Sequence, residues 1–449
     1  MICIRVPRAF YYLAAVYVAV SLVYTTTSHF LQLHRALTTY YGRTFFSGSL
    51  SWLAPGHPET PTPLARTHQE LIHGIPSGTV YWNSSTRGPN AAASEDLFLS
   101  KAFSTSMRPS KIIPYFYRAS DRPAANDVTI TTLITSNRFH VFSRLVERYR
   151  GPISVAIHVK NVTSHVDELL ASLHTLYASS PLMAQHVDVH LIVDAFDRQF
   201  NTWRNVARFF ARTDYVMMLD IDFSVCTDFR RVIRFTPDLR QRLDSGVALV
   251  IPAFEYSNLD EGTNQDVFPR TKEALLNLVN VGRIGMFHAS WQPGHNSTDY
   301  GKYYVSSPGE VYEVTHYQPS YEPYIVMRKD GPPWCDERFV GYGGNKAACL
   351  FEIYLSGVSF QVLADHFIIH QNHLYEETIR KNERKYNRKL YAEFKEEACL
   401  KYLKVYADAG ILHAERGRNA REQCVRIRSI ARVAGQIIES SQGLGSLQD

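Results

Sequence analysis

A short apolar stretch that ends in two acids places the strongest constraint on the fold of this chain. Val216 to Leu219 are apolar without interruption, and Asp220 and Asp222 follow one residue apart. A continuous apolar run of this length is typical of a strand that is buried on both faces of a sheet. In open α/β sheets, ligands bind outside the carboxyl ends of the strands, which is where these acids would lie. Side chains alternate along an extended strand, so both carboxylates are expected on one side, where they can share a divalent cation. The alternative is a strand that runs into a solvated acidic turn.

The start of the chain predicts a membrane anchor. Residues 9–28 carry no formally charged side chain, and Phe10 to Tyr24 is nearly all apolar or aromatic. About 20 such residues span a bilayer. Arg5 and Arg8 precede the stretch and place residues 1–8 in the cytosol. A cleaved signal peptide is the alternative, but no small-x-small cleavage site follows closely. The sequence therefore predicts a single-pass type II protein with the remaining chain in the secretory lumen.

Weaker features agree with a lumenal location. Acceptor tripeptides for N-glycosylation begin at Asn83, Asn161 and Asn296. One of the six cysteines, Cys3, precedes the anchor, which leaves five and hence at most two disulfides within the chain. A net charge of +5 over 449 residues is mild and gives no reason to expect a nucleic-acid partner.

The remaining chain divides by composition. Residues 29–125 are expected to form a partly disordered stem, because residues 54–63 are proline-rich and extended. Residues 126–410 alternate strand and helix patterns, which predicts an α/β domain with a mainly parallel sheet and helices on both faces. Residues 411–449 are predicted to be a C-terminal tail. The strands expected before the Asp220 strand are 128–135, 153–159 and 187–193.

Eight sequence blocks, taken in order, resemble glycosyltransferase family 49. That family includes the β-1,4-glucuronyltransferase and the LARGE-type enzymes that build the sugar chain on dystroglycan. The resemblance covers residues from about 127 to 405. It implies a GT-A fold, a manganese-dependent inverting transfer from a UDP-sugar donor to a glycan or glycoprotein acceptor, and a Golgi membrane location. The same resemblance favours glucuronic acid as the sugar, with xylose, a hexose or an N-acetylhexosamine as alternatives. The blocks are Gly151–Ser154, Arg204–Ala207, Tyr215–Phe223, Val250–Glu255, Glu322–Tyr324, Arg338–Gly343, Asn345–Lys346 and Phe367–His370.

The resemblance also suggests the ligands of the Mn²⁺ ion. Asp220 and Asp222 would bind it, and a GT-A site usually takes a further ligand from near the C-terminus of the domain. Residues 362–370 are expected to form an apolar strand that ends in His370. The match to the family favours His370 over His373, which lies three residues later. A histidine that only caps an edge strand is the alternative.

Six polar residues are candidates for binding the nucleotide. Two follow the first strand, where a uridine would dock, although capping of the next helix explains them equally well. Two belong to the helix before the metal strand, where they bind the nucleotide or pack beneath it. Two follow a glycine-rich turn at the start of a helix, and helix N-termini favour anions. The six are Ser136, Asn137, Arg204, Asn205, Asn345 and Lys346.

The catalytic base is harder to assign. In related GT-A enzymes a carboxylate near the start of this helix acts as the base, but this chain has Asn345 and Lys346 there. An inverting transfer needs a base near the acceptor hydroxyl. Glu352, on the same helical face, and Asp336, before the turn, are the candidates, with Glu337 also possible. Each has a structural alternative as an ion-pair partner or a solvated acid.

An aromatic segment between residues 253 and 324 is expected to contact the acceptor, since aromatic faces stack on sugar rings. Ordinary packing is the alternative. Two other functions compete with an active transferase. One is an inactive lumenal carbohydrate-binding or scaffold protein on the same fold. The other is a phosphate-ester hydrolase, which normally needs a richer His and Asp cluster. The aromatic segment contains Phe287, His288, Trp291, His295, Tyr300, Tyr303 and Tyr304.

Overall fold

The structure is a computed structural model that describes residues 79–82, 91–94, 111–160, 163–194, 198–373 and 377–442. All of them belong to one compact unit, Pro63–Asp449. The predicted anchor at residues 9–28 lies outside the described residues. Within the described ranges, no helix is both long enough and apolar enough to cross a membrane.

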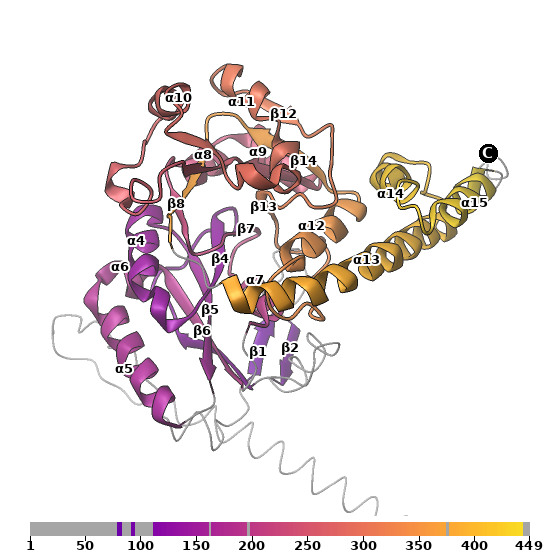
Figure 1. The fold of residues 1–449 in the computed structure, drawn as a ribbon. Helices are drawn as coiled ribbons and strands as arrows, with labels where there is room; N and C mark the ends of the chain where they lie inside the picture. Colours follow the sequence, from indigo (N-terminus) through magenta and orange to yellow (C-terminus); the bar gives the residue numbers. More distant parts are fainter. Residues whose placement is uncertain are drawn as a thin grey trace, which may run out of the picture. The chain divides into compact units, whose positions relative to one another are not determined.

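A nine-stranded mixed sheet forms the centre of this unit (Figure 1). Its strand order is β12-β14-β9-β13-β7-β4-β5-β6-β3. Three strands, β3, β12 and β13, run opposite to the others, so the sheet is parallel only in part. The bounds are β3 Lys111–Tyr117, β4 Val128–Ile134, β5 Ile153–Lys160, β6 Val187–Asp194, β7 Tyr215–Met218, β9 Val247–Ile251, β12 Val311–Glu313, β13 Tyr324–Arg328 and β14 Ser359–Leu363.

Strand β7 explains why the sheet has helices on both faces. All four of its residues are buried, as the apolar run predicts. Tyr215 and Met217 pack into one hydrophobic cluster, and Val216 and Met218 pack into another on the opposite face. Five helices supply the first cluster, namely α4 Phe139–Tyr149, α5 Thr163–Ser179, α6 Pro181–His186, α8 Phe229–Phe235 and α9 Pro237–Asp244. The second face is covered by α7 Phe200–Phe209, α12 Asn345–Leu355 and α13 Glu377–Asp408.

A second sheet of four strands gathers segments from distant parts of the sequence. Its order is β11-β10-β15-β8. The predicted single strand over residues 362–370 is wrong, because β14 ends at Leu363 and the chain turns before β15. This break sends β15 into the second sheet, beside the end of the Asp222 turn. The bounds are β8 Phe223–Val225, β10 Ala253–Tyr256, β11 Ile284–Met286 and β15 Ile368–His370. The other elements are the hairpin β1 Thr79–Trp82 and β2 Ala91–Ser94, with helices α10 Lys272–Asn280 and α11 Tyr300–Val305.

The folded domain extends beyond the predicted bounds at both ends. β3 pairs with β6, so the predicted stem is wrong from residue 111 onward. Pro114 weakens the strand signal there, but an edge strand tolerates proline. The predicted tail is wrong for residues 411–442. This stretch contains two helices, α14 Arg418–Cys424 and α15 Ala431–Gln442, and its residues Leu412, Ile430 and Ala434 are part of the core. The disulfide Cys399–Cys424 ties α14 to α13.

A buried histidine in the sheet, His190, should make the stability depend on pH. Its Nδ1 accepts a hydrogen bond from the Tyr115 main-chain N–H (2.9 Å), and its Nε2 lies 3.0 Å from Ser154 Oγ. The Ser154 hydroxyl donates to the Ala207 carbonyl, so the ring is neutral and carries its proton on Nε2. Burial, and then the positive charge of Arg212, lower the pKa of His190 to about 3. The unfolded chain takes up this proton near pH 6.5, so each pH unit below that value costs about 1.4 kcal/mol.

Urea unfolding at pH 7.5 and pH 5.5 tests this expectation. A His190→Gln variant keeps an acceptor for Tyr115 and a donor for Ser154 but cannot titrate. Its free energy of unfolding should fall by about 1.4 kcal/mol less than that of the natural chain between the two pH values. An equal fall in both proteins would contradict the assignment.

Candidate active site

The two acids of the central motif have different surroundings. The Leu219 N–H still donates to the Thr131 carbonyl of β4 (3.0 Å), but the Phe223 N–H donates back to the Asp220 carbonyl (3.2 Å). The chain therefore turns between these residues instead of continuing as a strand. Strand alternation does not apply inside a turn, so it no longer gives a reason for the carboxylates of Asp220 and Asp222 to lie on one side. Each carboxylate has its own set of partners.

Asp220 is surrounded by two cations and a phenol. Its carboxylate lies 3.2 Å from the Arg204 guanidinium and 3.1 Å from the Lys346 ammonium, and it accepts a hydrogen bond from the Tyr324 hydroxyl (2.8 Å). The Lys346 ammonium also lies 3.3 Å from the centre of the Tyr324 ring. Burial would raise the pKa of Asp220, but Lys346, Arg204 and Tyr324 outweigh it and hold that pKa well below its usual value. Asp220 is therefore an ionised, charge-compensated group.

Asp222 belongs to a second group, with two histidines. One oxygen of Asp222 lies 3.2 Å from His373 Nε2, and the other lies 3.4 Å from Arg138 Nε. Ligand atoms of Asp222, His370 and His373 all lie within 4.8 Å of one another. Burial lowers the pKa of His370 to about 4, so its imidazole is neutral at pH 7, the form that binds metals. We call these three residues the Asp222 cluster. One carboxylate and two imidazoles suit a divalent transition metal such as Mn²⁺.

The second sheet explains how His370 reaches Asp222. In β15, His370 pairs with Phe223 of β8 on one side and with Glu255 of β10 on the other. The main-chain N–H of Gln371 then donates to the Asp222 carbonyl (2.7 Å). His370 and His373 thus both lie beside Asp222, so the geometry of the described residues does not separate His370 from His373 as the favoured ligand.

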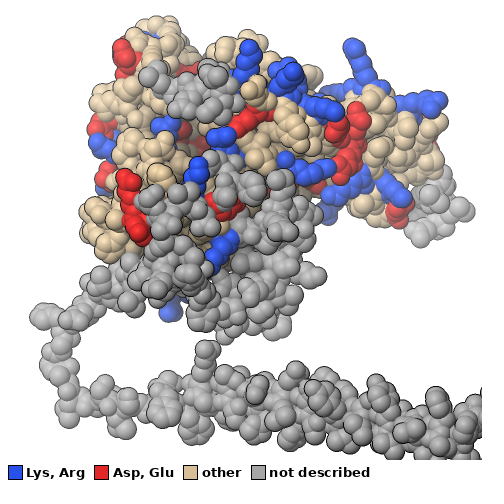
Figure 2. Space-filling view, turned by 60° about the horizontal axis from the view of Figure 1, so that its bottom comes forward, with Lys and Arg blue, Asp and Glu red and all other residues tan. Residues whose placement is uncertain are grey.

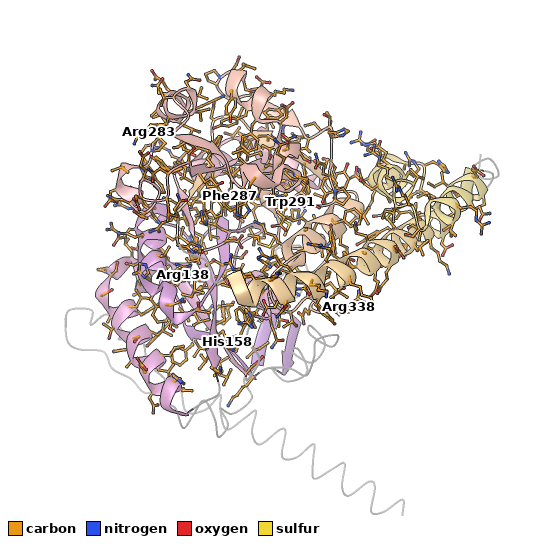
Figure 3. The ribbon with its side chains drawn as sticks, viewed as in Figure 1. Arg138, His158, Arg283, Phe287, Trp291 and Arg338 are labelled. Atoms are coloured by element: carbon orange, nitrogen blue, oxygen red, sulfur yellow. A yellow bond between two sulfur atoms is a disulfide. The ribbon has the colours of Figure 1, made fainter. Side chains whose placement is uncertain are left out.

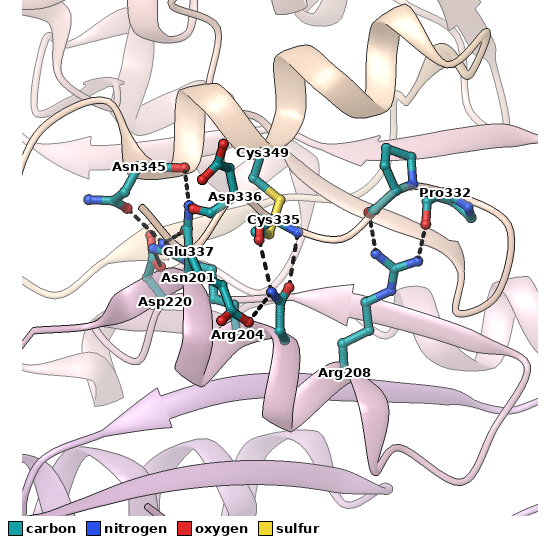
Figure 4. The surroundings of a disulfide bond; sticks show 12 residues. Asn201, Arg204, Arg208, Asp220, Pro332, Cys335, Asp336, Glu337, Asn345 and Cys349 are labelled. Atoms are coloured by element: carbon teal, nitrogen blue, oxygen red, sulfur yellow. Dashed lines mark hydrogen bonds and ion pairs between the residues drawn. A yellow bond between two sulfur atoms is a disulfide. The ribbon is translucent and has the colours of Figure 1, made fainter. Parts of the chain in front are cut away.

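Side chains of helix α7 hold the segment before α12 in place through hydrogen bonds (Figure 4). Asn205 forms two hydrogen bonds with the main chain of Cys335 (2.9 and 3.0 Å) and one with the Glu337 carboxylate. Cys335 is in turn joined to Cys349 of α12 by a disulfide. Asn205 is 3% exposed. It therefore holds the disulfide segment, and the structure gives no support to its predicted contact with a nucleotide.

Arg204 connects this support to the site. Its guanidinium donates to Asn345 Oδ1 (2.7 Å) and to Asp220 (3.2 Å), as Figure 4 shows. Asn345 is buried and also donates to the Gly341 carbonyl (3.0 Å). Gly344, just before α12, has a φ of 72°, a conformation that favours glycine. Arg204 and Asn345 therefore position Asp220 and the start of α12.

The residues after β4 lie at the edge of the same site. Ser136 and Asn137 are exposed in a short 3-10 helix, Ser136–Arg138, and Asn137 accepts a hydrogen bond from the Thr135 hydroxyl (2.6 Å). Their exposure leaves both side chains accessible to a ligand. Arg138, which no sequence motif indicated, is the residue of this helix that contacts Asp222.

Neither predicted catalytic base lies in the Asp222 cluster. Glu352 accepts hydrogen bonds from Lys401 (2.9 Å) and Tyr402 (3.4 Å) of α13, so it joins two helices. It lies seven residues beyond Asn345, about 10 Å along α12. Asp336 makes a two-oxygen pair with Arg338, which also contacts Glu397 of α13. The structural alternatives hold for both acids.

A different carboxylate, Glu255, lies beside the cluster. It pairs in register with His370, and its Oε1 accepts a hydrogen bond from the His288 main-chain N–H (2.8 Å). Its side chain is partly exposed. The pKa of Glu255 is raised, because burial outweighs the hydrogen bonds from His288 and Ala289. The sequence contained this residue in a family block, but no local signal revealed its proximity to His370.

Most of the aromatic segment forms core, not surface. Phe287 is buried against the His370 ring (4.8 Å between centroids), and Tyr300 and Tyr303 pack on Phe254. Trp291 is the exception among the large aromatics of this segment, with 60% of its surface exposed. In Figure 3, Phe287 and Trp291 lie above Arg138, while Arg338 lies apart, beside α13. The acceptor prediction therefore narrows to Trp291 and the exposed His288.

This geometry occurs in a chain whose family can be shown. A family model described as "Glycosyl-transferase for dystroglycan" matches residues 127–200 and 194–403, which is more than half of the chain. The chain belongs to this family. All the residues of the Asp222 cluster and the Asp220 network lie within the match, whereas α14 and α15 lie beyond it.

Curated relatives from the LARGE group are similar over the same region. Xylosyl- and glucuronyltransferase LARGE2 of Mus musculus is 33% identical over 257 residues, 56% of this chain and 35% of that protein. LARGE1 of Homo sapiens is 29% identical over 266 residues, 58% of this chain and 33% of that protein. The chain thus spans about a third of the length of the curated relatives it matches.

One solved structure is a distant neighbour. A crystal structure of GalNAc-T7 with UDP, GalNAc and Mn²⁺ is 12% identical and covers 72% of this chain and 55% of its own, with a TM-score of 0.35. A likeness this low adds nothing about the fold or the site. The mixed α/β architecture rests on the described sheets and helices themselves.

Proposed function

We propose that this dystroglycan-family chain is a metal-dependent inverting glycosyltransferase of the secretory pathway, with a GT-A type domain. It transfers a sugar, glucuronic acid by family resemblance, from a UDP-sugar to a glycan acceptor. The single observation that carries the proposal is the Asp222 cluster, which lies beyond the carboxyl end of β7. The names of its relatives, xylosyl- and glucuronyltransferases, support the choice of reaction. A Golgi membrane location through residues 9–28 belongs to the same proposal.

The residues have separate tasks in this reaction. Asp222, His370 and His373 would hold Mn²⁺, whose charge stabilises the departing diphosphate. Arg138 is 24% exposed and adjoins the cluster, so it can bind a phosphate oxygen from the other side. Lys346 and Arg204 neutralise Asp220, which would otherwise repel the diphosphate.

Glu255 is the proposed base. Asn345 and Lys346 cannot take a proton as a carboxylate does, and Glu352 and Asp336 are occupied by Lys401 and Arg338. Glu255 lies next to His370 on the same sheet and is partly exposed. It is therefore the described carboxylate best placed to accept the proton of an acceptor hydroxyl near the metal.

A panel of UDP-sugars tests the function. The purified full chain is incubated with Mn²⁺ and UDP-glucuronic acid, UDP-xylose, UDP-glucose or UDP-N-acetylglucosamine, and release of UDP is measured with and without EDTA. We expect hydrolysis of one donor, abolished by EDTA. Mn²⁺-dependent binding of UDP with no hydrolysis or transfer would instead support the carbohydrate-binding alternative, which the lack of an acid at Asn345 favours. Absence of UDP binding would contradict the transferase.

A further inference from the structure

Apart from the candidate active site, the surface has a hollow whose lining is strongly basic. Its volume is about 440 Å³, within the range of small-molecule sites. It is enclosed by the end of α4, by the connection between β8 and α8, and by α8 itself. Arg270, from the segment between β10 and α10, completes the lining. Among the described residues that line it, six are arginines and one, Asp228, is a carboxylate. The arginines are Arg148, Arg150, Arg230, Arg231, Arg234 and Arg270.

This hollow is separate from the Asp222 cluster. Helix α4 begins directly after Arg138, which contacts Asp222, and it ends at Tyr149, which lines the hollow. Its 11 residues rise about 16 Å. The two sites therefore lie at opposite ends of one helix, and the proposed reaction uses no residue of the second.

The positive charge of the lining is only partly neutralised. Asp127 pairs with Arg230 (2.7 Å) and Arg234 (3.4 Å), and Asp266 pairs with Arg148 (2.8 Å). Three of the six guanidinium groups are therefore paired with a carboxylate. The two acids that pair with them, Asp127 and Asp266, are not part of the lining.

The other three arginines form none of these ion pairs. Arg270 donates to two main-chain carbonyls, and Arg150 donates to one. The Asp228 carboxylate accepts from the Arg231 main-chain N–H, so it caps α8. The face in Figure 2 shows acidic and basic side chains interspersed, which makes a lining of six arginines a local excess. Guanidinium groups match carboxylate, sulfate and phosphate oxygens in pairs.

The rim of the hollow adds an apolar face. Phe235 is 70% exposed, and the Arg234 guanidinium lies 5.5 Å from the centre of its ring. The Tyr149 ring, whose centre lies 5.7 Å from Arg230, is buried, so Phe235 supplies the open face. Exposed aromatic rings pack on the apolar face of a sugar, while adjacent arginines bind its charged substituents. A lone inorganic anion would leave Phe235 without a role.

We propose that this hollow binds an acidic oligosaccharide, one whose rings carry carboxylate, sulfate or phosphate groups. The choice of a saccharide rests on the proposed function, whereas the binding of an anion does not. A charged unit held here keeps the acceptor chain on the protein and raises the effective concentration of its reacting end at the catalytic centre.

Binding measured without Mn²⁺ or UDP tests the proposal separately from catalysis. The full chain is titrated by calorimetry with tetragalacturonate, a heparin-derived tetrasaccharide, inorganic phosphate, neutral maltotetraose and an oligothymidylate of matched charge. We expect at least one acidic saccharide to bind, with an affinity that falls as salt rises, and maltotetraose not to bind. The carboxylate and sulfate arms identify the preferred group, and the inorganic phosphate arm separates binding of a saccharide from binding of an anion alone.

A pair of double variants locates the binding. Arg150→Gln with Arg231→Gln removes two exposed charges from the lining and should weaken binding at least about tenfold. Arg428→Gln with Arg432→Gln removes the same charge from the C-terminal region and should leave affinity within about twofold. Arg231→Gln alone serves if the first double variant does not fold.

Four results of the binding experiments would overturn the proposal, and a fifth is given after them. They are the absence of binding by both acidic saccharides, an affinity unchanged by the lining variants, equal loss in the two double variants, and equally tight binding of the oligothymidylate. Binding of phosphate alone would also reject the saccharide. A chain that fails to hydrolyse every UDP-sugar yet binds an acidic saccharide through Arg231 would refute the proposed reaction and leave this site standing.

Discussion

Replacing Asp222 by asparagine should remove the Mn²⁺-dependent binding of UDP and lower donor turnover by about 100-fold or more. The substitution keeps the shape of the side chain but removes the one negative charge of the Asp222 cluster. Loss of groups that merely orient a metal ligand already costs about 10 to 100-fold in metal affinity, and a ligand should cost at least as much. Thermal shift with UDP over an Mn²⁺ titration, together with the rate of UDP release, measures both effects.

Asp220→Asn is the matched control, and it should behave differently. Lys346 and Arg204 have side chains that are 4% and 10% exposed, so removing the Asp220 charge leaves two buried cations without it. We expect the free energy of unfolding to fall by about 2 kcal/mol, in contrast to a small change for Asp222→Asn. An unchanged Mn²⁺ requirement in Asp222→Asn would contradict the metal site.

The histidines extend this comparison. Because His370 and His373 both lie within the Asp222 cluster, alanine at either position should raise the Mn²⁺ requirement and allow partial recovery at high Mn²⁺. The sequence favoured a strong effect at His370 and a much weaker one at His373. A normal Mn²⁺ requirement in either variant removes that histidine from the ligand set.

Replacing Glu255 by glutamine should lower kcat by about 10² to 10⁴-fold while leaving the affinity for UDP and Mn²⁺ unchanged. General base catalysis contributes about that much. Glutamine can still accept the hydrogen bond from the His288 N–H, so the local turn is retained and only the proton acceptor is lost. Transfer kinetics and a UDP thermal shift separate the two quantities.

Glu352→Gln provides the control for this experiment. Glu352 pairs with Lys401, so its replacement should lower the melting temperature and change kcat by less than about twofold. A large loss of kcat in Glu352→Gln, together with normal turnover in Glu255→Gln, would restore the base that the sequence suggested.

The strands with continuous apolar patterns were predictable from the sequence. β4, β5, β6 and β7 lie within about two residues of their expected positions, because β-branched and apolar runs bounded by polar turns leave little choice. The mixed direction of the sheet was not predictable. β13 enters antiparallel between β7 and β9, and nothing local to its sequence fixes its neighbours.

The sequence indicated which segments form the site, but not which side chains are in contact there. Asp222 and His370 could be found from motif and family, since Asp222 follows an apolar strand and His370 ends one. Their partners depend on register and turns. The pairing of Glu255 with His370 is a contact between segments more than 100 residues apart in the sequence. The turn that separates Asp220 from Asp222 is a local break in the strand. The fold of residues 411–442 was not predicted, because the apolar residues of this stretch become buried only by packing with α13.

The two disulfides have a consequence for how the chain is made. They join cysteines 14 and 25 residues apart, all four of them after residue 334, and the other described cysteine, Cys226, is buried. Each loop can be closed as soon as its own short segment has been synthesised, and closing a loop of this size adds about 3 kcal/mol in the chain-entropy account. The central strands up to β13 are complete before the first of these cysteines emerges. Production in a reducing host should therefore yield chains with the strands up to β13 assembled and loosened packing of α12, α13 and α14, and an oxidant is needed only for the last third of synthesis.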